Sequence, residues 1–211
     1  MPDIQCLPRH VADLIAAGEV VERPASVAKE LLENALDAGA TAIVAEVQRG
    51  GLTYLRITDN GCGIAPQQLP TAFLRHATSK IRKKEDLACI GTLGFRGEAL
   101  AAISSVSKID LLTRAQGAEN GVRLHLEAGQ VLSEEPAGCP CGTTILVREL
   151  FYNTPARMKF MKSDAAESSA VFSVVQQQAL AHPEISFRFL KDGQEQLHTD
   201  GQGDRMAAIY A

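Results

Sequence analysis

A helical stretch rich in carboxylates and amides is the part of this sequence best suited to chemistry. The segment KELLENALDAG, Lys29 to Gly39, spaces Glu30, Asn34 and Asp37 by four and three residues. Residues at these spacings share one face of a helix. A carboxylate at the edge of a buried surface can act as a base, and an amide oxygen can ligate a hard cation such as Mg²⁺. A solvated polar face is the alternative interpretation of this helix taken alone.

The helix that must carry these side chains has clear start and stop signals. Pro24 suits a first helical turn and Gly39 suits a helix stop in a left-handed conformation, which predicts one helix from Pro24 to Ala38. A neighbouring apolar ridge can pack on a core; it consists of Val27, Leu31, Ala35 and Ala38, extended by Leu32 and Leu36. Glu30 and Asn34 are therefore expected at the edge of that buried surface.

A second polar element follows a predicted strand. Residues 53–58 (TYLRIT) alternate in polarity and run into DNGCGI at 59–64, a glycine turn with an acid at the strand end. Asp59 could accept a hydrogen bond from an exocyclic amine. Gly61 and Gly63 allow positive φ and the close approach of a flat ligand. Taken alone, a D-x-G-x-G turn is weak evidence, because many hairpin turns share it.

A third element combines spaced glycines with the start of a helix. In GTLGFRGEAL, residues 91–100, the glycines lead into an alanine-rich helical segment, which presents free backbone N–H groups to an anion. This arrangement is typical of a phosphate cradle. It matches neither the P-loop motif nor the G-x-G-x-x-G motif that follows a strand.

The order of these motifs resembles that of the GHKL ATPases, a superfamily that includes gyrase-type topoisomerases, heat-shock chaperones, histidine kinases and MutL proteins. The shared order is E-x-x-x-N, D-x-G-x-G, G-F-R-G-E-A-L and a Gly-Thr-Thr before a strand, at 142–144. Longer segments resemble the MutL family of bacterial DNA mismatch-repair proteins: residues 15–40, DNGCGI, RHATSK at 75–80, LGFRGEALAAISSV at 93–106 and LFYNTPARMKF at 150–160. Five motifs in one order make chance agreement negligible.

The resemblance implies roles for individual residues of an ATP site. Glu30 would be the general base that activates water for attack on the γ-phosphate, and Asn34 would hold the Mg²⁺ that bridges the phosphates. Asp59 would bind the adenine amino group, with Thr143 supporting that contact through water. Lys80 would add charge to a lid over the phosphates, although a solvated lysine is the alternative there. The other residues implied to bind ATP are Ala38, Gly61, Gly63, Ile64, Thr78, Ser79, Gly94, Phe95, Arg96, Gly97, Glu98, Ala99 and Leu100, of which Thr78, Ser79 and residues 94–100 would belong to the lid.

The resemblance also implies a function for the whole protein. It would be an ATP-gated, dimerising clamp that hydrolyses ATP slowly and couples mismatch recognition by MutS to a strand-nicking endonuclease and a helicase. A nucleotide-dependent interaction module without hydrolysis is one alternative, and another GHKL ATPase such as a gyrase-type subunit is a second.

One departure from the family concerns the end of the chain. A lysine that reaches the γ-phosphate comes from a second domain in the family, so a chain that stops at Ala211 is expected to be a fragment with little turnover. We expect residues 1–200 to form the ATP-binding domain and residues 201–211 to begin a linker or second domain. Residues 204–211 (DRMAAIYA) have a helical pattern.

Composition predicts a cytoplasmic domain with a sizeable core. The 211 residues are 45% hydrophobic, and no apolar run approaches the ~20 residues that span a bilayer. A net charge of −4 argues against DNA binding by bulk charge. The weak, sequence-independent DNA binding that the resemblance implies would therefore use local patches, Lys80 to Lys84 or Arg157, Lys159 and Lys162, for which solvated surface is the alternative. Five irregularly spaced cysteines predict reduced thiols and no transition-metal site.

The pattern along the chain predicts an α+β fold, a two-layer sandwich of helices on a mixed, largely antiparallel sheet, in place of a doubly wound parallel sheet. A short helix at 8–17 closed by Gly18, helical segments within 66–106 and a long helix at 164–182 are expected. Predicted strands are 41–48 and 53–59, an antiparallel meander of 108–114, 121–127, 130–134 and 143–148, and a final hairpin of 185–190 and 195–198. The GHKL resemblance implies the same fold, also called the Bergerat fold.

Overall fold

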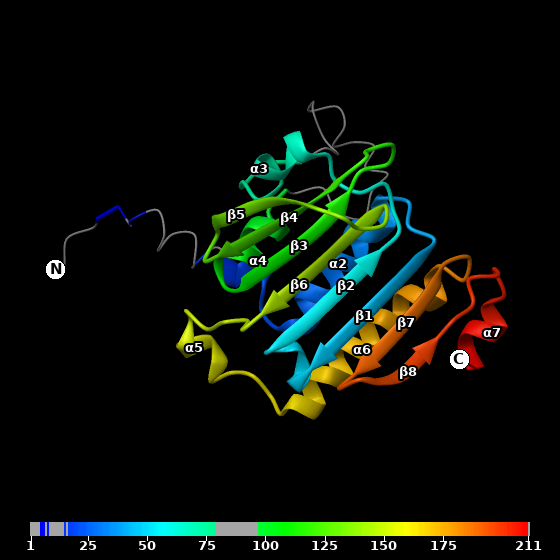
Figure 1. Ribbon diagram of the computed structural model, residues 1–211. Coiled ribbons are helices and arrows are strands. Elements are labelled where there is room, and N and C mark those ends of the chain that lie inside the picture. Colours follow the sequence, from blue (N-terminus) through cyan, green and yellow to red (C-terminus); the bar gives the residue numbers. More distant parts are fainter. Residues whose placement is uncertain (1–4, 7, 9–14, 16, 79–96, 211) are drawn as a thin grey trace, which may run out of the picture.

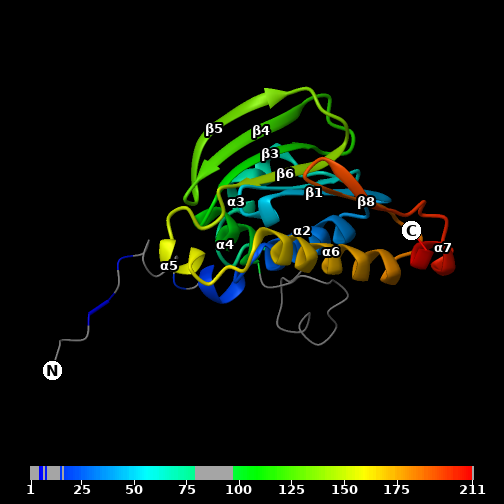
Figure 2. The ribbon, with the colours of Figure 1, turned by 90° about the horizontal axis from the view of Figure 1, so that it is seen from below.

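The computed structural model describes residues 5–6, 8, 15, 17–78 and 97–210. These residues form two layers, one sheet of eight strands and a set of helices on one of its faces (Figure 1; Figure 2). The long helices α2 (Pro24–Asp37) and α6 (Asp164–Ala181) pack on each other, and the short helix α4 (Ala99–Ser105) touches α2. The predicted α+β two-layer sandwich is confirmed.

The sheet has the order β5-β4-β3-β6-β2-β1-β7-β8. Neighbouring strands are antiparallel except β1 and β7, which are parallel. The bounds are β1 (Ala42–Gln48), β2 (Tyr54–Asp59), β3 (Lys108–Arg114), β4 (Gly121–Glu127), β5 (Gln130–Ala137), β6 (Gly142–Arg148), β7 (Ser186–Lys191) and β8 (Gln194–His198). All eight predicted strands are present, each within a few residues of its expected bounds.

Two details of the prediction are wrong. The strand β6 does not extend the meander beyond β5; it pairs with β3 and β2 near the middle of the sheet. Its inward side chains Thr143, Ile145 and Val147 are buried, whereas β5 has no buried residue and therefore suits an edge. The second error concerns Gly18, which was expected to close a helix. Residues 17–20 are helical through Gly18, and Val21 N donates to Ala17 O (2.8 Å). Most of the helix expected at 8–17 lies outside the described residues.

Shorter elements complete the fold. These are the 3-10 turns η1 (Arg49–Gly51) and η2 (Pro66–Gln68) and the helices α3 (Leu69–Ala72), α5 (Pro155–Met158) and α7 (Arg205–Tyr210). The helical pattern expected at the end of the chain is confirmed by α7. In the part of the chain that the structure describes, no helix combines the length and the apolar character needed to cross a membrane.

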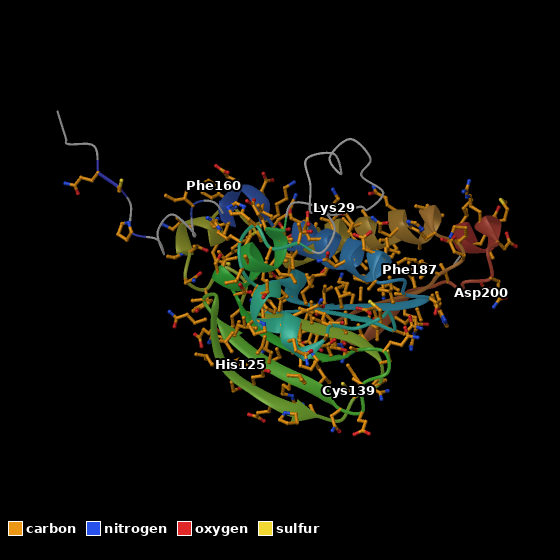
Figure 3. The ribbon with its side chains drawn as sticks, turned by 90° about the horizontal axis from the view of Figure 1, so that it is seen from above. Lys29, His125, Cys139, Phe160, Phe187 and Asp200 are labelled. Atoms are coloured by element: carbon orange, nitrogen blue, oxygen red, sulfur yellow. The ribbon has the colours of Figure 1, made fainter. Side chains whose placement is uncertain are left out.

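The core lies between the helices and one face of the sheet. Leu31 and Leu32 of α2 are buried, as are inward side chains of the central strands such as Ile57 and Val147. Each fully buried side chain of this size stabilises the fold by about 1.5–3 kcal/mol. The other face of the sheet carries ion pairs such as Arg56 with Glu46 (2.6 Å). Figure 3 shows the two sides of the sheet, with Lys29 on the helical side of the molecule and His125 on the opposite side.

Candidate functional site

Asp59 ends β2 and organises the centre of the candidate site. Its Oδ1 accepts hydrogen bonds from the backbone N–H groups of Gly61 (2.9 Å) and Thr143 (3.3 Å). Burial raises the pKa of Asp59 above its ordinary value, and the two backbone N–H groups oppose that shift in part. Among the described residues Oδ2 makes no hydrogen bond. The carboxylate is therefore fixed by one oxygen and can accept a ligand's N–H group with the other.

The turn after Asp59 is held against the end of α2. Cys62 N donates to Ala38 O (2.9 Å), and a Cβ added at Gly61 would lie 2.8 Å from both the Cβ and the carbonyl oxygen of Ala38. Gly63 adopts the expected positive φ of 69°, but Gly61 does not have a positive φ. The glycine at 61 is thus required for close packing and not for backbone conformation.

Thr113 on β3 is a structural member of this site that the sequence analysis missed. Its buried Oγ1 accepts from Ile64 N (2.9 Å) and lies 3.0 Å from both Thr143 Oγ1 and Gly142 O. It therefore ties the DNGCGI turn to two strands at once. The signal in the sequence was a polar residue in the inward register of KIDLLTR, two residues after Leu111.

Helix α2 presents Glu30, Asn34 and Asp37 as half-buried side chains, as the spacing predicts, and its body packs on β2. Glu33 is more deeply buried, and its carboxylate lies 3.7 Å from Lys29 Nζ. Burial raises the pKa of Glu33, and the charge of Lys29 partly opposes that shift. The helix ends as predicted, because Gly39 adopts a φ of 70°.

The start of α2 is anchored by a buried ion pair that the sequence analysis did not identify. Arg23, the residue before the helix, donates from Nε (3.1 Å) and Nη2 (2.7 Å) to Glu167, whose side chain is 0% exposed. Lys162 N also donates to Glu167 (3.0 Å). Burial, the largest effect, raises the pKa of Glu167, but the hydrogen bonds from Arg23 and Lys162 N outweigh it and the pKa lies below its ordinary value. Helix α2 is therefore fixed on α6 one to two turns before Glu30.

The RHATSK and GFRGEAL segments, which were expected to form a lid, meet at their described ends. A Cβ added at Gly97 would lie 3.0 Å or less from backbone atoms of Ala77, and Glu98 Oε1 lies 3.1 Å from His76 Nδ1. Ala99 and Leu100 form the first turn of α4, and Thr78 follows Ala77. The expected site residues Ser79, Lys80, Gly94, Phe95 and Arg96 lie outside the described residues, as does the basic cluster from Lys80 to Lys84.

The second basic cluster, Arg157, Lys159 and Lys162, is not wholly a surface patch for DNA. Arg157 Nη1 donates to the carbonyl oxygens of Gly18 (3.0 Å) and Val21 (2.9 Å), so its guanidinium is bound within the fold. Lys159 and Lys162 are exposed. Only these two lysines of the cluster remain candidates for contacts with DNA.

Comparison with known proteins identifies the class of protein that this fold and site define. Residues 22–137 match the family of histidine kinase-, DNA gyrase B- and HSP90-like ATPases, and the chain belongs to that family. Within it, the chain matches the ATPase domain of MutL-type DNA mismatch-repair proteins.

The individual relatives support this assignment. The chain is 52% identical over 210 residues to the DNA mismatch repair protein MutL of Agathobacter rectalis, a match that covers 100% of the chain and 32% of that protein. It is 51% identical over 209 residues to MutL of Streptococcus thermophilus, covering 99% of the chain and 32% of that protein. The solved ATPase domain of Aquifex aeolicus MutL complexed with ADP superposes with a TM-score of 0.74 at 33% identity, covering 90% of this chain and 68% of that one. The chain spans about a third of the length of the curated relatives it matches.

Proposed function

We propose that this chain binds ATP with Mg²⁺ between α2 and the end of β2 and hydrolyses it slowly. The observation that carries the proposal is the geometry of Asp59, whose Oδ1 is held by two backbone N–H groups while Oδ2 is left to accept from the adenine amino group. Guanine has a carbonyl oxygen at the same position and would place two acceptors against each other. The match to an ADP-bound MutL ATPase domain supports the same pocket.

The residues of α2 would supply the chemistry. Glu30 is half-buried and would accept a proton from the water that attacks the γ-phosphate. The amide oxygen of Asn34 suits Mg²⁺, which usually takes one or two protein oxygens together with substrate phosphates. Bound Mg²⁺ would neutralise the charge of the phosphates. Thr143 would support the adenine contact through water, and Ala38, Gly61, Gly63 and Ile64 would form the wall beside the base.

The remaining ATP-binding residues would close the site. Thr78 and residues 97–100, with Ser79, Lys80, Gly94, Phe95 and Arg96 from outside the described part, would cover the phosphates. We further propose that residues 1–200 form this domain and that α7 belongs to the beginning of the following linker or domain.

In the whole protein, nucleotide binding would drive dimerisation of a cytoplasmic mismatch-repair clamp. The clamp would bind DNA weakly and without sequence preference, and it would couple MutS to a strand-nicking endonuclease and a helicase. The identity to curated MutL proteins over the whole chain supports this assignment.

The binding step is tested by calorimetric titration of a non-hydrolysable ATP analogue with Mg²⁺ into the chain and into its Asp59→Asn variant. The variant keeps an Oδ1 for Gly61 and Thr143, but it presents an amide N–H group where Oδ2 was. It should therefore keep the fold and lose adenine binding. Equal affinity of the two proteins would refute the pocket. Light scattering during the titration should show a doubling of mass if nucleotide drives dimerisation.

The hydrolytic step is tested by Glu30→Ala in a chain extended to the length of the relatives. Loss of turnover with retained nucleotide binding supports the role of Glu30 as the base. Undiminished turnover would exclude that role. If the Glu30→Ala variant still dimerises on nucleotide binding, hydrolysis serves only to reset the clamp. If the wild-type protein dimerises on ATP but never hydrolyses it, the protein is the interaction module considered above.

A further inference from the structure

The turn formed by residues 151–157, called here the NTPAR turn, is attached to the end of α4. Asn153 Nδ2 donates to Ser105 O (2.8 Å), the carbonyl of the last residue of α4. Phe151 N donates to Val106 O (2.7 Å), and the Phe151 ring is fully buried. The turn therefore holds the C-terminal end of the helix that begins at the GFRGEAL motif.

The same turn is attached to the segment that leads into α2. Arg157 Nη1 donates to Gly18 O (3.0 Å) and to Val21 O (2.9 Å), and the guanidinium carbon lies 5.7 Å from the centre of the Phe151 ring. Val21 is 1% exposed and stands three residues before Pro24, where α2 begins. One short turn thus holds both the helix that carries Glu30 and the helix that follows the lid motif.

Gly18 provides independent evidence for this contact. Gly18 is helical and does not have a positive φ, so its backbone conformation does not require glycine. A Cβ at this position would overlap the guanidinium of Arg157, and the three nearest atoms that it would meet belong to that guanidinium. The position of the Arg157 guanidinium therefore explains why residue 18 has no side chain.

We propose that Arg157 is a positioning residue for ATP turnover, acting by holding the entrance of α2 in register with α4 across the nucleotide site. This inference rests on the proposed function. Arg23 anchors the start of α2 to α6, whereas Arg157 anchors the residues just before α2 to the turn that also holds α4. A base must be held within a fraction of an ångström of the attacking water, and small displacements lower turnover more than binding.

The contact can be removed from either side. Arg157→Met keeps a stem of similar shape but leaves the carbonyls of Gly18 and Val21 without their donor. Gly18→Ala leaves Arg157 intact and displaces only its guanidinium, and alanine is the better helix former, so the local helix is not weakened. Arg157→Lys restores a charged donor without the planar fork. Arg123→Met makes the same substitution at an exposed arginine of β4 and is the matched control.

The first measurement uses the nucleotide-free chain and needs no turnover. The amide of Val21 donates to Ala17 O (2.8 Å), so its hydrogen exchange reports on this segment. Exchange should accelerate about tenfold or more in Arg157→Met and Gly18→Ala, and should be unchanged in Arg123→Met. The amide of His182, at the end of α6, should keep its exchange rate in all variants. Unchanged exchange at Val21 in both variants would overturn the proposal.

The second measurement is steady-state ATP hydrolysis in a chain extended to the length of the relatives. Arg157→Met and Gly18→Ala should lower kcat about tenfold and leave KM and the affinity for a non-hydrolysable analogue within about twofold, with partial rescue in Arg157→Lys. Unchanged kcat in the presence of faster Val21 exchange would make the contact purely structural and overturn the proposal. A wild-type protein that neither binds nor hydrolyses ATP would refute the proposed function itself. If the wild-type protein is active and the variants have the same activity, only the positioning role of Arg157 is refuted.

Discussion

The buried ion pair between Arg23 and Glu167 leads to an unequal cost for removing its two partners. The Glu167 side chain is 0% exposed, whereas the Arg23 side chain is 33% exposed. Arg23→Ala leaves a buried carboxylate with only the Lys162 N–H group as a donor, which costs about 3–5 kcal/mol. Glu167→Gln leaves a guanidinium that reaches water and an amide oxygen that still accepts, but it also places a buried NH2 group against one donor of Arg23, so the cost is about 1–3 kcal/mol. For a domain of this size, Arg23→Ala should lower the Tm by roughly 10 °C and Glu167→Gln by roughly 4 °C.

Thermal and urea unfolding of both variants test this difference. The matched control is Arg188→Ala, because Arg188 also pairs through Nε (2.8 Å) and Nη2 (2.7 Å) with a glutamate, Glu195, but the two side chains are 47% and 39% exposed. Its cost should be about 0–1 kcal/mol. The pKa of Glu167 is lower in the folded than in the unfolded state, so its stabilisation is full above the unfolded pKa of about 4.3 and is lost as the pH falls through the folded pKa. A larger cost for Glu167→Gln than for Arg23→Ala, or an equal cost for Arg188→Ala, would refute the reasoning.

Three further predictions concern residues of the proposed nucleotide site. Thr113→Val removes the acceptor of Ile64 N and should lower the free energy of unfolding by about 1–3 kcal/mol in urea titrations, and a neutral result would show that the bond is dispensable. Gly63→Ala places a side chain at a φ of 69° and against the Arg114 carbonyl, which distorts the turn. Calorimetry should show that an ATP analogue binds this variant at least about tenfold more weakly, and unchanged affinity would contradict the role of the turn. Because burial raises the pKa of Asp59, affinity for adenine nucleotides should fall on acidification at a higher pH than an ordinary aspartate would give, and this fall should be absent from any residual binding by Asp59→Asn.

The local parts of the fold were readable from the sequence. Helix α2 runs from Pro24 to Asp37, one residue short of the predicted end, because a proline start, a glycine stop and an apolar ridge all act within the segment itself. The final hairpin was equally clear, since Asp192 and Gly193 both adopt the positive φ that its turn needs. Motif order further indicated which residues could surround a nucleotide.

The parts that depend on distant residues were not readable. The position of β6 between β3 and β2 depends on which strand has a face that can be buried in the core. The alternation of polar and apolar residues along a strand does not reveal which strands lie beside it. Arg23 and Glu167 are 144 residues apart, and the sequence around neither residue indicates that they form an ion pair. Gly18 was interpreted as a helix stop because glycine often serves that purpose, whereas here it makes room for Arg157. A glycine inside a helix can thus report a tertiary contact that no local rule predicts.

The parallel pairing of β1 with β7 has a consequence for how the protein is made. Ala42 lies opposite Ser186, so one edge of β1 gains its partner only after nearly the whole described chain has been synthesised. On the ribosome, β1 and β2 can form their hairpin early, but the outer edge of β1 stays open until β7 emerges. An open strand edge invites pairing with other chains. Release of a nascent chain shorter than about 190 residues should therefore yield an aggregating species, and chaperone protection during synthesis would have to last until β7 pairs with β1.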